Sequence, residues 1–333
     1  MNSSSVDATV DAGPLIVRLP ALQRALAEFD PIPAIEIAFL AASEGNAVAP
    51  PGGELLFDDP AGDAHIKFGY LPNSSHFIVK VIAGYYDNAC RGLPSLGGLV
   101  MLFDRRTGQP VAILLDDGWL TNLRTAAAGA VAARYLAPRR VRAIGVLGTG
   151  VQARMQVEHL QHVTPCRDLI AWGRNPENLA RYAAEMTGKG YRVVAADNPG
   201  QVAAAANLIV TATPSATPLL LREQIRPGTH ITAIGADTAD KNELDPAILR
   251  AADIAAVDSR LLAGTRGESR RALEAGILAP SDLLELGEIV AEPTLGRRTD
   301  DQITVADLCG LAVQDIIIAE AALEALRRIG EPA

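Results

Sequence analysis

The chain has 333 residues, of which 49% are hydrophobic and 21% are charged, and its formal net charge is −9. This composition is typical of a globular protein with two domains and excludes a disordered chain. The negative balance argues against nucleic acid or an anionic membrane as a main partner, because no surplus of lysine and arginine exists to neutralise phosphates.

The cysteines and the apolar segments bear on the compartment. Cys90, Cys166 and Cys309 are far apart and odd in number, so they give no metal spacing and indicate a reducing cytoplasm. The first residues lack a basic segment followed by an apolar run, so we expect no secretory signal. No uninterrupted apolar stretch approaches the roughly 18 residues of a membrane span. The sequence therefore predicts a cytoplasmic protein with no membrane partner.

The first third of the chain has the pattern of helices followed by hairpins. Helical spacing is present in "LPALQRALAEF" (19–29) and "PAIEIAFLAAS" (33–43). Strand-like segments separated by Asn, Gly, Pro and Asp turns follow at 65–72, 77–86, 96–104 and 110–120. The alanine-rich segment 122–138 predicts a helix that ends at Pro138 and bridges to the rest of the chain.

After residue 138, apolar runs rich in Val and Ile alternate with helical patterns. The expected strands are 141–148, 168–173, 191–196, 207–213, 230–236 and 253–258. Short runs that are apolar throughout, each followed by a helix, indicate βαβ units whose sheet is covered on both faces. A last helix is expected over 307–326.

These patterns predict an α/β fold with a Rossmann doubly wound parallel sheet and a second, α+β domain. We expect the Rossmann dinucleotide-binding domain to span 126–304. Residues 1–125 together with 305–333 are predicted to form the substrate-binding and dimerisation domain.

The turn Gly148-Thr149-Gly150-Val151-Gln152-Ala153 fits the pattern G-x-G-x-x-A. The first glycine makes a tight turn, the second lets the backbone approach a pyrophosphate, and a small residue at the third position lets the helix sit close to the strand. The turn follows a strand and opens a helix, which favours a dinucleotide site. The alternative is a glycine turn that serves packing alone.

The end of the second strand bears on the choice of nucleotide. An acid there would hold the 2′-hydroxyl of the ribose in NAD. Asp168 has the right spacing but precedes its strand, and Arg174 and Asn175 stand at the strand's end instead. This arrangement favours NADP(H) over NAD(H), although Arg174 in a solvated loop is the alternative reading.

Three charged residues stand out as candidates for chemistry. Arg124 lies where a loop enters the alanine-rich helix, and its planar fork suits a carboxylate. Lys80 interrupts the apolar strand "HFIVKVIAGYY", either as an edge-strand gatekeeper or as a cation lining a pocket. Asp237 follows an apolar strand, at the sheet end where ligands gather in doubly wound folds, or it caps the following loop.

Several segments together resemble the ornithine cyclodeaminase/mu-crystallin family: "NLRTAAAGAVAARYLA", "GVLGTGVQARMQ", "AIGADTADKNELDP" and "DDQITVADLCGLAVQD". The resemblance runs from about Lys67 to Asp315. The variants "FIVKVIAGYYDN", "GLPSLGGL" and "RTDDQITVADL" look most similar to members associated with ectoine breakdown. The family's activities are NAD(P)-linked and share hydride transfer at a carbon that bears an amino or imino group next to a carboxylate.

The resemblance implies roles for individual residues. Arg124 and Lys80 would bind the substrate carboxylate, and Lys80 and Asp237 would be catalytic, with Asp237 transferring a proton at the substrate amine. Lys67 is a weaker candidate for substrate binding from its place on the preceding strand alone, where a functional and a structural reading are equally open. Thr211, Ala212, Thr213 and Ser215 would line the cofactor. Gly310, near a helix start, would direct its N–H toward the nicotinamide.

The chain departs from true ornithine cyclodeaminases, which carry a glutamate acid/base and a carboxylate-binding arginine upstream of the lysine motif. The corresponding region, 48–72, contains no arginine, and Lys67 lies near the expected glutamate. An acid is still available nearby, from Glu54, Asp58, Asp59 or Asp63. The departure argues against ornithine cyclisation and leaves the shared hydride step.

The sequence therefore predicts an NAD(P)-dependent oxidoreductase that acts on the C–N bond α to a carboxylate of an amino or imino acid. Two alternatives stay open: a redox-neutral cyclodeaminase of a diamino acid such as ornithine or diaminobutyrate, and a crystallin-like NADP-binding protein. His159 and His162 have helical spacing but no third ligand, so no metal site is expected. Strands with few helices to cover them predict a homodimer built through the residues before about 125.

Overall fold

The computed structural model describes residues 13–330, and the chain divides into two compact units. The mixed-sheet unit contains residues 13–29, 49–119 and 319–330, and the parallel-sheet unit contains 30–48 and 120–318. The functional roles that the sequence assigned to 1–125, 305–333 and 126–304 stay predictions.

The mixed-sheet unit holds six strands in the order β1-β6-β5-β4-β3-β2. β1 runs parallel to β6 and every other neighbouring pair is antiparallel. The strands are β1 (Leu15–Arg18), β2 (Gly53–Asp58), β3 (Ala61–Gly69), β4 (His76–Gly84), β5 (Leu96–Asp104) and β6 (Pro110–Leu115). The four strands predicted from the sequence are present, whereas β1 and β2 were missed. β1 has only four residues, and β2 follows "APPGG", which reads as a loop.

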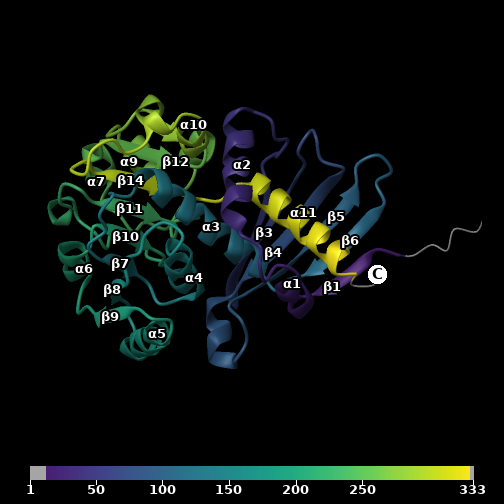
Figure 1. Ribbon diagram of the computed structural model, residues 1–333, viewed down its shortest axis with the longest axis horizontal. Helices are drawn as coiled ribbons and strands as arrows, with labels where there is room; N and C mark the ends of the chain where they lie inside the picture. The colour runs from purple at the N-terminus through teal and green to yellow at the C-terminus, as the bar shows by residue number, and fades with distance from the viewer. Residues whose placement is uncertain (1–12, 331–333) are drawn as a thin grey trace, which may run out of the picture. The chain divides into compact units, whose positions relative to one another are not determined.

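The two faces of this sheet differ, because β4 buries every second residue. The face of Ile78, Lys80 and Ile82 is buried, and the C-terminal half of α11 (Ala312–Ile329) crosses it (Figure 1), where Glu320 lies 3.3 Å from His76. The opposite face is apolar and partly exposed. It carries Ile16, Ile66, Phe68, Phe77, Val79, Met101, Phe103 and Ile113.

The parallel-sheet unit holds eight strands in the order β13-β12-β14-β11-β10-β7-β8-β9, and all of its pairs are parallel. The bounds are β7 (Ile144–Leu147), β8 (Asp168–Trp172), β9 (Arg192–Ala195), β10 (Leu208–Thr211), β11 (His230–Ala233), β12 (Ile254–Val257), β13 (Leu283–Glu285) and β14 (Thr304–Asp307). The strand order reverses between β7 and β10, which is the topological switch point of a doubly wound fold. The predicted fold class is confirmed.

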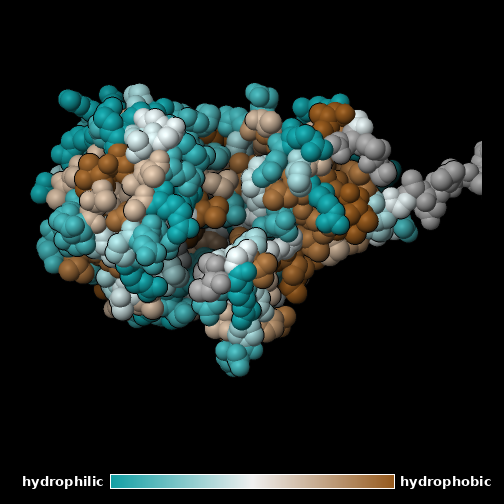
Figure 2. Space-filling model, turned by 90° about the horizontal axis from the view of Figure 1, so that it is seen from below, coloured by the Kyte–Doolittle hydropathy of each residue, from teal (hydrophilic) through white to brown (hydrophobic). Residues whose placement is uncertain are grey.

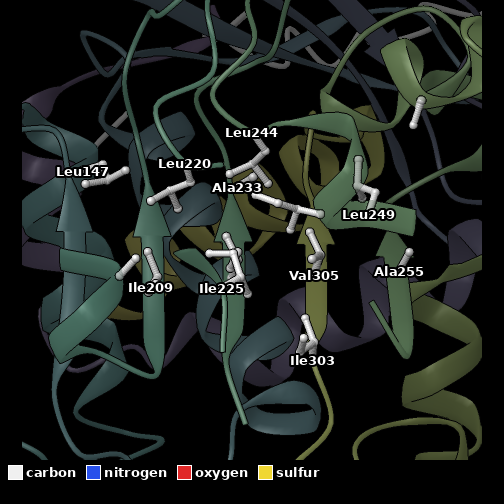
Figure 3. Packing of buried hydrophobic residues seen from close by; sticks show 14 of the residues in the cluster. Leu147, Ile209, Leu220, Ile225, Ala233, Leu244, Leu249, Ala255, Ile303 and Val305 are labelled. Carbon is white, nitrogen blue, oxygen red and sulfur yellow. The ribbon is translucent and has the colours of Figure 1, made fainter. Parts of the chain in front are cut away.

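Both faces of the parallel sheet are buried, as its apolar strands require. On one face, Leu147, Ile209, Ala233 and Val305 project from four strands into a common cluster, which Leu220, Leu244 and Leu249 complete (Figure 3). On the other, Val146 and Val210 pack with residues of α4 and α5, including Val157 and Tyr182.

The helices are mostly those that the sequence predicts. They are α1 (Leu19–Ala25), α2 (Pro31–Ser43), α3 (Trp119–Leu136), α4 (Val151–Leu160), α5 (Pro176–Gly188), α6 (Pro199–Ala205), α7 (Pro246–Ala251), α8 (Arg260–Ala263), α9 (Glu268–Glu274), α10 (Leu286–Ala291) and α11. None of the helices within residues 13–330 combines the length and the apolar character that a membrane crossing requires.

The region 304–311 corrects the sequence analysis. The expected helix over 307–326 begins only at Ala312, and β14 precedes it and inserts between β11 and β12. β14 was missed because its four residues follow the polar segment "GRRTDDQ", which has no strand pattern. β13, with three residues, was missed for the same reason of length.

Candidate active site

The carboxyl ends of five adjacent strands bring the candidate residues of the parallel-sheet unit to one edge. The strand order places the segments after β14, β11, β10, β7 and β8 side by side. Residues of these five segments include Gly310, Asp237, Thr213, Gly150 and Arg174. Because ligands of doubly wound sheets bind at this edge, these residues share the expected ligand site.

The glycine turn between β7 and α4 has the geometry of a pyrophosphate site. Gly148 has φ +120°, and a Cβ there would lie 2.6 Å from the Ala212 carbonyl oxygen. Gly150 is the N-cap of α4, with no side-chain cap, and a Cβ there would meet nothing within 4 Å. The space in front of the helix N-terminus is therefore open to an anion, whose charge the helix dipole favours.

The other residues of the turn differ in exposure and in contacts. Val151 is exposed, and Ala153 is fully buried, as the close approach of helix and strand requires. The side chain of Gln152 donates to the Asn122 carbonyl oxygen at 3.1 Å and to its side-chain oxygen at 3.0 Å. Gln152 therefore ties α4 to α3, and its contact with a nucleotide stays a prediction. Thr149 packs against Gly173, where a Cβ would lie 2.5 Å from the Thr149 methyl.

The loop after β8 presents Arg174 to solvent. Asn175 is the N-cap of α5, and its side-chain oxygen accepts from the backbone N–H groups of Glu177 and Asn178. Asp168 begins β8 at the opposite end and pairs with Arg192 at 2.6 Å, so it is not the ribose-binding acid. Roles for Arg174 and Asn175 at a ribose stay predictions.

The loop after β10 is held by a carboxylate that the sequence analysis missed. Glu243 Oε2 accepts from the Thr211 hydroxyl at 2.8 Å and from the Gly235 N–H at 2.9 Å, and Oε1 accepts from the Thr213 N–H and hydroxyl at 2.7 Å each. The two threonine hydroxyls thus face Glu243. Any cofactor contact from Thr211, Ala212 and Thr213 would come from other atoms of the loop.

Asp237 lies in the loop after β11, with about half of its side chain exposed, and Lys241 donates to it at 2.6 Å. Burial raises the pKa of the Cys309 thiol, and the charges of Asp307, Asp258 and Asp237 raise it further. Asp237 therefore lies within electrostatic range of the segment after β14. Its exposure and its ammonium partner suit a group that exchanges protons with a ligand.

Arg124 is buried in α3, where Nε donates to Asp315 at 3.1 Å and Nη1 donates to Gln314 at 3.1 Å. Its guanidinium lies against Gly310, whose φ is +84° and whose added Cβ would collide with Nη1. The Gly310 N–H donates to Asp258, which corrects the expectation that this N–H faces the nicotinamide. Gly310 instead makes room for Arg124, and a cofactor contact through its other atoms stays a prediction.

Lys80 and Lys67 lie in the mixed-sheet unit as cross-strand partners of β4 and β3, so both side chains leave the same face. Lys80 is only 2% exposed. On that face His65 lies two residues from Lys67, with its ring 3.6 Å from Glu54 and 3.4 Å from Asp63. Two of the four acids that the sequence left open therefore share a face with the lysines.

Two further buried acids, Glu268 and Asp307, accept hydrogen bonds near Glu243 and near the start of α9. Glu268 accepts from the N–H groups of Glu243 and Leu244, and Asp307 accepts from the Ser269 N–H. Burial is the main cause that raises the pKa of Glu243 to about 7 and that of Glu268 to about 8, and it also raises the pKa of Asp307. The sequence analysis missed these acids, because they share no local pattern: Glu243 precedes a leucine, whereas Glu268 precedes a serine.

The described residues contain no group of three or more His, Cys, Asp or Glu side chains arranged to hold a metal ion. His159 Nδ1 lies 2.8 Å from the Met155 carbonyl oxygen, and burial lowers the pKa of His159. Cys166 and Cys309 are free thiols, and the side chain of Cys90 lies outside the described residues.

A comparison with protein families decides what these residues belong to. Residues 21–328 match the model of the ornithine cyclodeaminase/mu-crystallin family. The chain belongs to the ornithine cyclodeaminase/mu-crystallin family. The resemblance seen in the sequence is thereby confirmed for the family, with no evidence specific to ectoine.

Individual members of the family show its range. An uncharacterized cyclodeaminase of Sinorhizobium fredii is 38% identical over 300 residues, which cover 89% of this chain and 91% of that protein. An archaeal alanine dehydrogenase dimer with bound NAD has TM-score 0.88, 30% identity, and coverage of 96% of this chain and 98% of that one. The Δ1-pyrroline-2-carboxylate reductase of Thermococcus litoralis, solved with NADH and L-proline, has TM-score 0.89, 30% identity, and coverage of 95% and 98%.

Proposed function

We propose that the protein is an NAD(P)-dependent oxidoreductase that acts on the C–N bond α to a carboxylate, as an imino acid reductase or amino acid dehydrogenase. The observation that carries this proposal is the open turn at Gly150 on the same sheet edge as Asp237 and as Gly310, against which the Arg124 guanidinium lies. Homologues that are 33 to 36% identical include an alanine dehydrogenase, an iminosuccinate reductase and a Δ1-pyrroline-2-carboxylate reductase.

The chemistry divides between the cofactor and the chain. A bound nicotinamide supplies hydride to the imine carbon, or accepts it in the reverse direction. The candidate cations for the substrate carboxylate are Arg124 in the parallel-sheet unit and Lys80, with Lys67 as a further cation, in the mixed-sheet unit, because fixed cations orient a planar anion. Asp237 holds or releases the proton on the substrate nitrogen. Fixed cations and a positioned acid supply most of the rate through preorganisation.

The decisive experiment follows nicotinamide absorbance with a panel of substrates. The panel contains Δ1-pyrroline-2-carboxylate and pyruvate with ammonia, each with NADH and with NADPH. It also contains the diamino acids ornithine and diaminobutyrate, each with NAD+ and with NADP+, because their cyclisation begins with hydride transfer to the oxidised cofactor. Oxidation of the cofactor by an imino acid supports the proposal. Ammonia release from a diamino acid without net change of the cofactor would replace it by a cyclodeaminase.

Cyclodeamination is a second candidate because of the acids beside the lysines. Glu54 and Asp63 flank His65 on the face of Lys67 and Lys80, so a carboxylate is available for the distal amine of a diamino acid. A diaminobutyrate-type substrate, as in the ectoine-associated members that the sequence resembles, fits this candidate. If the nucleotide binds tightly and no substrate of the panel turns over, the protein is instead a binding protein of the crystallin type.

The finer cofactor preference is part of the proposal. Arg174, exposed at the end of β8 where no acid stands, supports NADP(H) over NAD(H). The solved relatives with printed cofactors contain NAD or NADH, which supports the opposite choice. Competitive titration with both reduced cofactors decides between them.

A homodimer through the mixed-sheet unit is the proposed assembly. The sheet face with Phe68, Val79 and Met101 is apolar, and on it Ile16 and Phe68 are 62% and 37% exposed. Figure 2 shows apolar side chains gathered on the surface of this unit. Apolar sheet faces of this kind pair with a second copy, and the archaeal alanine dehydrogenase relative is a dimer. Light scattering on Val79→Asp should give a monomer; a monomeric wild type would contradict the proposal.

A further inference from the structure

The candidates for a further role are the buried polar groups that the proposed chemistry does not use. Among these, Glu243 is fully buried and receives four hydrogen bonds. Removing a carboxylate from water is costly, and a purely structural position of this kind can be filled by apolar side chains. A buried carboxylate with a full set of donors therefore indicates that its partners need to be held in a particular arrangement.

The donors come from the ends of two neighbouring strands and the loops that follow them. Thr211 is the last residue of β10, Thr213 belongs to the loop after it, and Gly235 belongs to the loop after β11. Each loop reaches the carboxylate through at least one backbone or hydroxyl donor, and Oε2 is shared between the two loops. Glu243 thus joins the loop next to the glycine turn with the loop that carries Asp237.

The two loops also meet directly. A Cβ at Gly235 would collide with the Thr213 carbonyl oxygen and with Glu243 Oε2. Gly148 approaches the same loop from the other side, where its added Cβ would lie 2.6 Å from the Ala212 carbonyl oxygen. The pyrophosphate turn, the β10 loop and the β11 loop are therefore packed in series, with Glu243 between the last two.

Glu243 itself is fixed from behind. Its N–H donates to Glu268 Oε1 at 2.7 Å, and the Leu244 N–H donates to Oε2 at 3.0 Å. Asn242 donates to the same carboxylate at 2.6 Å. The segment 242–244 cannot follow a moving loop without breaking these bonds, so it serves as a rigid reference for both loops.

We propose that Glu243 is a positioning residue that sets the distance between the nucleotide-binding loop after β10 and the proton-transferring Asp237 after β11. The role rests on the proposed function, because it presumes that both loops serve one hydride and proton transfer. Both carboxylate oxygens of Glu243 accept hydrogen bonds from the protein itself. It acts through Gly235, two residues before Asp237, and through Thr213.

The test compares Glu243→Gln with Asn207→Ala. Gln has the shape of Glu but only one acceptor oxygen, so its NH2 group faces either the two donors of Thr213 or the donors of Thr211 and Gly235. Asn207 is a matched control, because it is a buried polar side chain that ties the start of β10 to the segment 140–142 before β7, at the amino end of the same sheet. Both variants are expected to melt earlier than the wild type, and assays are run well below both transitions.

Glu243→Gln should weaken NADH binding and lower kcat at saturating NADH about tenfold each, because a buried donor loses its acceptor. The KM for Δ1-pyrroline-2-carboxylate should stay within about threefold, since the carboxylate-binding cations are untouched. Asn207→Ala should keep both the NADH affinity and kcat. If the two variants behave alike in both assays, the positioning role is wrong.

Thr211→Val covers the case in which Glu243→Gln does not fold. It removes one hydroxyl donor to Oε2 without a change of shape and should give the same pattern at about threefold. If the wild type binds NADH but turns over no substrate, the proposed function is wrong, and NADH affinity alone then decides the role of Glu243. Unchanged NADH affinity in Glu243→Gln or in Thr211→Val would show that Glu243 is not a positioning residue.

Discussion

The two units place their candidate functional groups in different ways. In the parallel-sheet unit they lie beyond the carboxyl ends of strands whose own side chains are buried on both faces. In the mixed-sheet unit Lys67 and Lys80 lie within the strands, in register with each other. A sheet covered on both faces leaves only its edge for a ligand, whereas the two lysines of the mixed sheet project from its middle, on the buried face of Ile78 and Ile82.

The difference extends to the type of contact. The glycine turn offers backbone N–H groups and open space, so its recognition depends on the absence of side chains at Gly148 and Gly150. The lysines offer charge, and Lys80 is buried among Ile78, Ile82 and Val100. Substitutions of these glycines and of the lysines should therefore separate nucleotide binding from substrate chemistry, and the following experiments test that separation.

The largest effect is expected for Lys80→Met, which removes the charge and keeps the length of the side chain. With the buried cation lost, kcat/KM for the imino acid should fall by about 10²–10⁴. NADH affinity should be retained, because the parallel-sheet unit is unchanged. Steady-state kinetics and NADH titration measure both; Ile82→Met, on the same strand face, is the control and should keep its activity. Loss of NADH affinity in Lys80→Met would contradict the separation of nucleotide binding from substrate chemistry.

Gly150→Val should produce the converse result. The added side chain meets nothing in the protein within 4 Å of its Cβ, so the fold is kept, and it occupies the space that a pyrophosphate needs. NADH affinity should fall about tenfold to a hundredfold, taking the usual cost of steric overlap. Gly148→Ala should behave differently from Gly150→Val. Its Cβ would require a strained φ of +120° and would collide with the Ala212 carbonyl oxygen, so this variant should lose stability as well as NADH affinity. Normal NADH binding by Gly150→Val would reduce the turn to a packing feature.

Arg174→Asp tests which of the two nucleotides, NADPH or NADH, the site prefers. If the guanidinium binds a 2′-phosphate, the ratio of NADPH to NADH affinity should fall about tenfold or more, as for the loss of a charge-assisted hydrogen bond. Isothermal titration with both cofactors gives the ratio. An unchanged ratio would mean that Arg174 serves the surface alone, and NADP(H) preference would lose its support.

The smallest effect concerns the pH dependence of stability. Burial raises the pKa of Glu268 from 4.5 to about 8, so the folded chain keeps a proton that the unfolded chain releases. The resulting stabilisation is present below about pH 4.5 and is lost as the pH rises through about 8. Between these two pH values this contribution should make the unfolding free energy of the wild type fall as the pH rises. In Glu268→Gln this fall should be less steep, by up to about 1.4 kcal/mol per pH unit.

The measurement is best made above pH 6.5. Below it, His230 contributes a slope of opposite sign, because burial lowers its pKa from 6.5 to about 3. Denaturant titrations at several pH values between 6.5 and 8 give the slope for the wild type, for Glu268→Gln and for the exposed control Glu223→Gln. A Glu268→Gln slope equal to that of the wild type would show that Glu268 does not hold the extra proton.

The sequence predicts those features whose constraint is local. The glycine turn is readable because a positive φ, an open approach and a small third residue all act within six positions, 148–153. Lys80 is readable because a charge in an apolar strand is rare. β14 and Glu243 are not, since the position of β14 depends on pairing with β11 and β12, and Glu243 meets Thr211 across 32 residues. Nothing near Glu243 in the sequence indicates those partners.

The place of β14 has a consequence for synthesis of the chain on the ribosome. β12 and β13 emerge before β14, yet neither can join β11 until Thr304–Asp307 has left the exit tunnel, because β14 lies between them. Until then β11 and β12 are two open parallel edges, which are the kind of surface that invites aggregation during translation. A nascent chain halted shortly before Thr304 should depend on chaperones far more than one released a few dozen residues later.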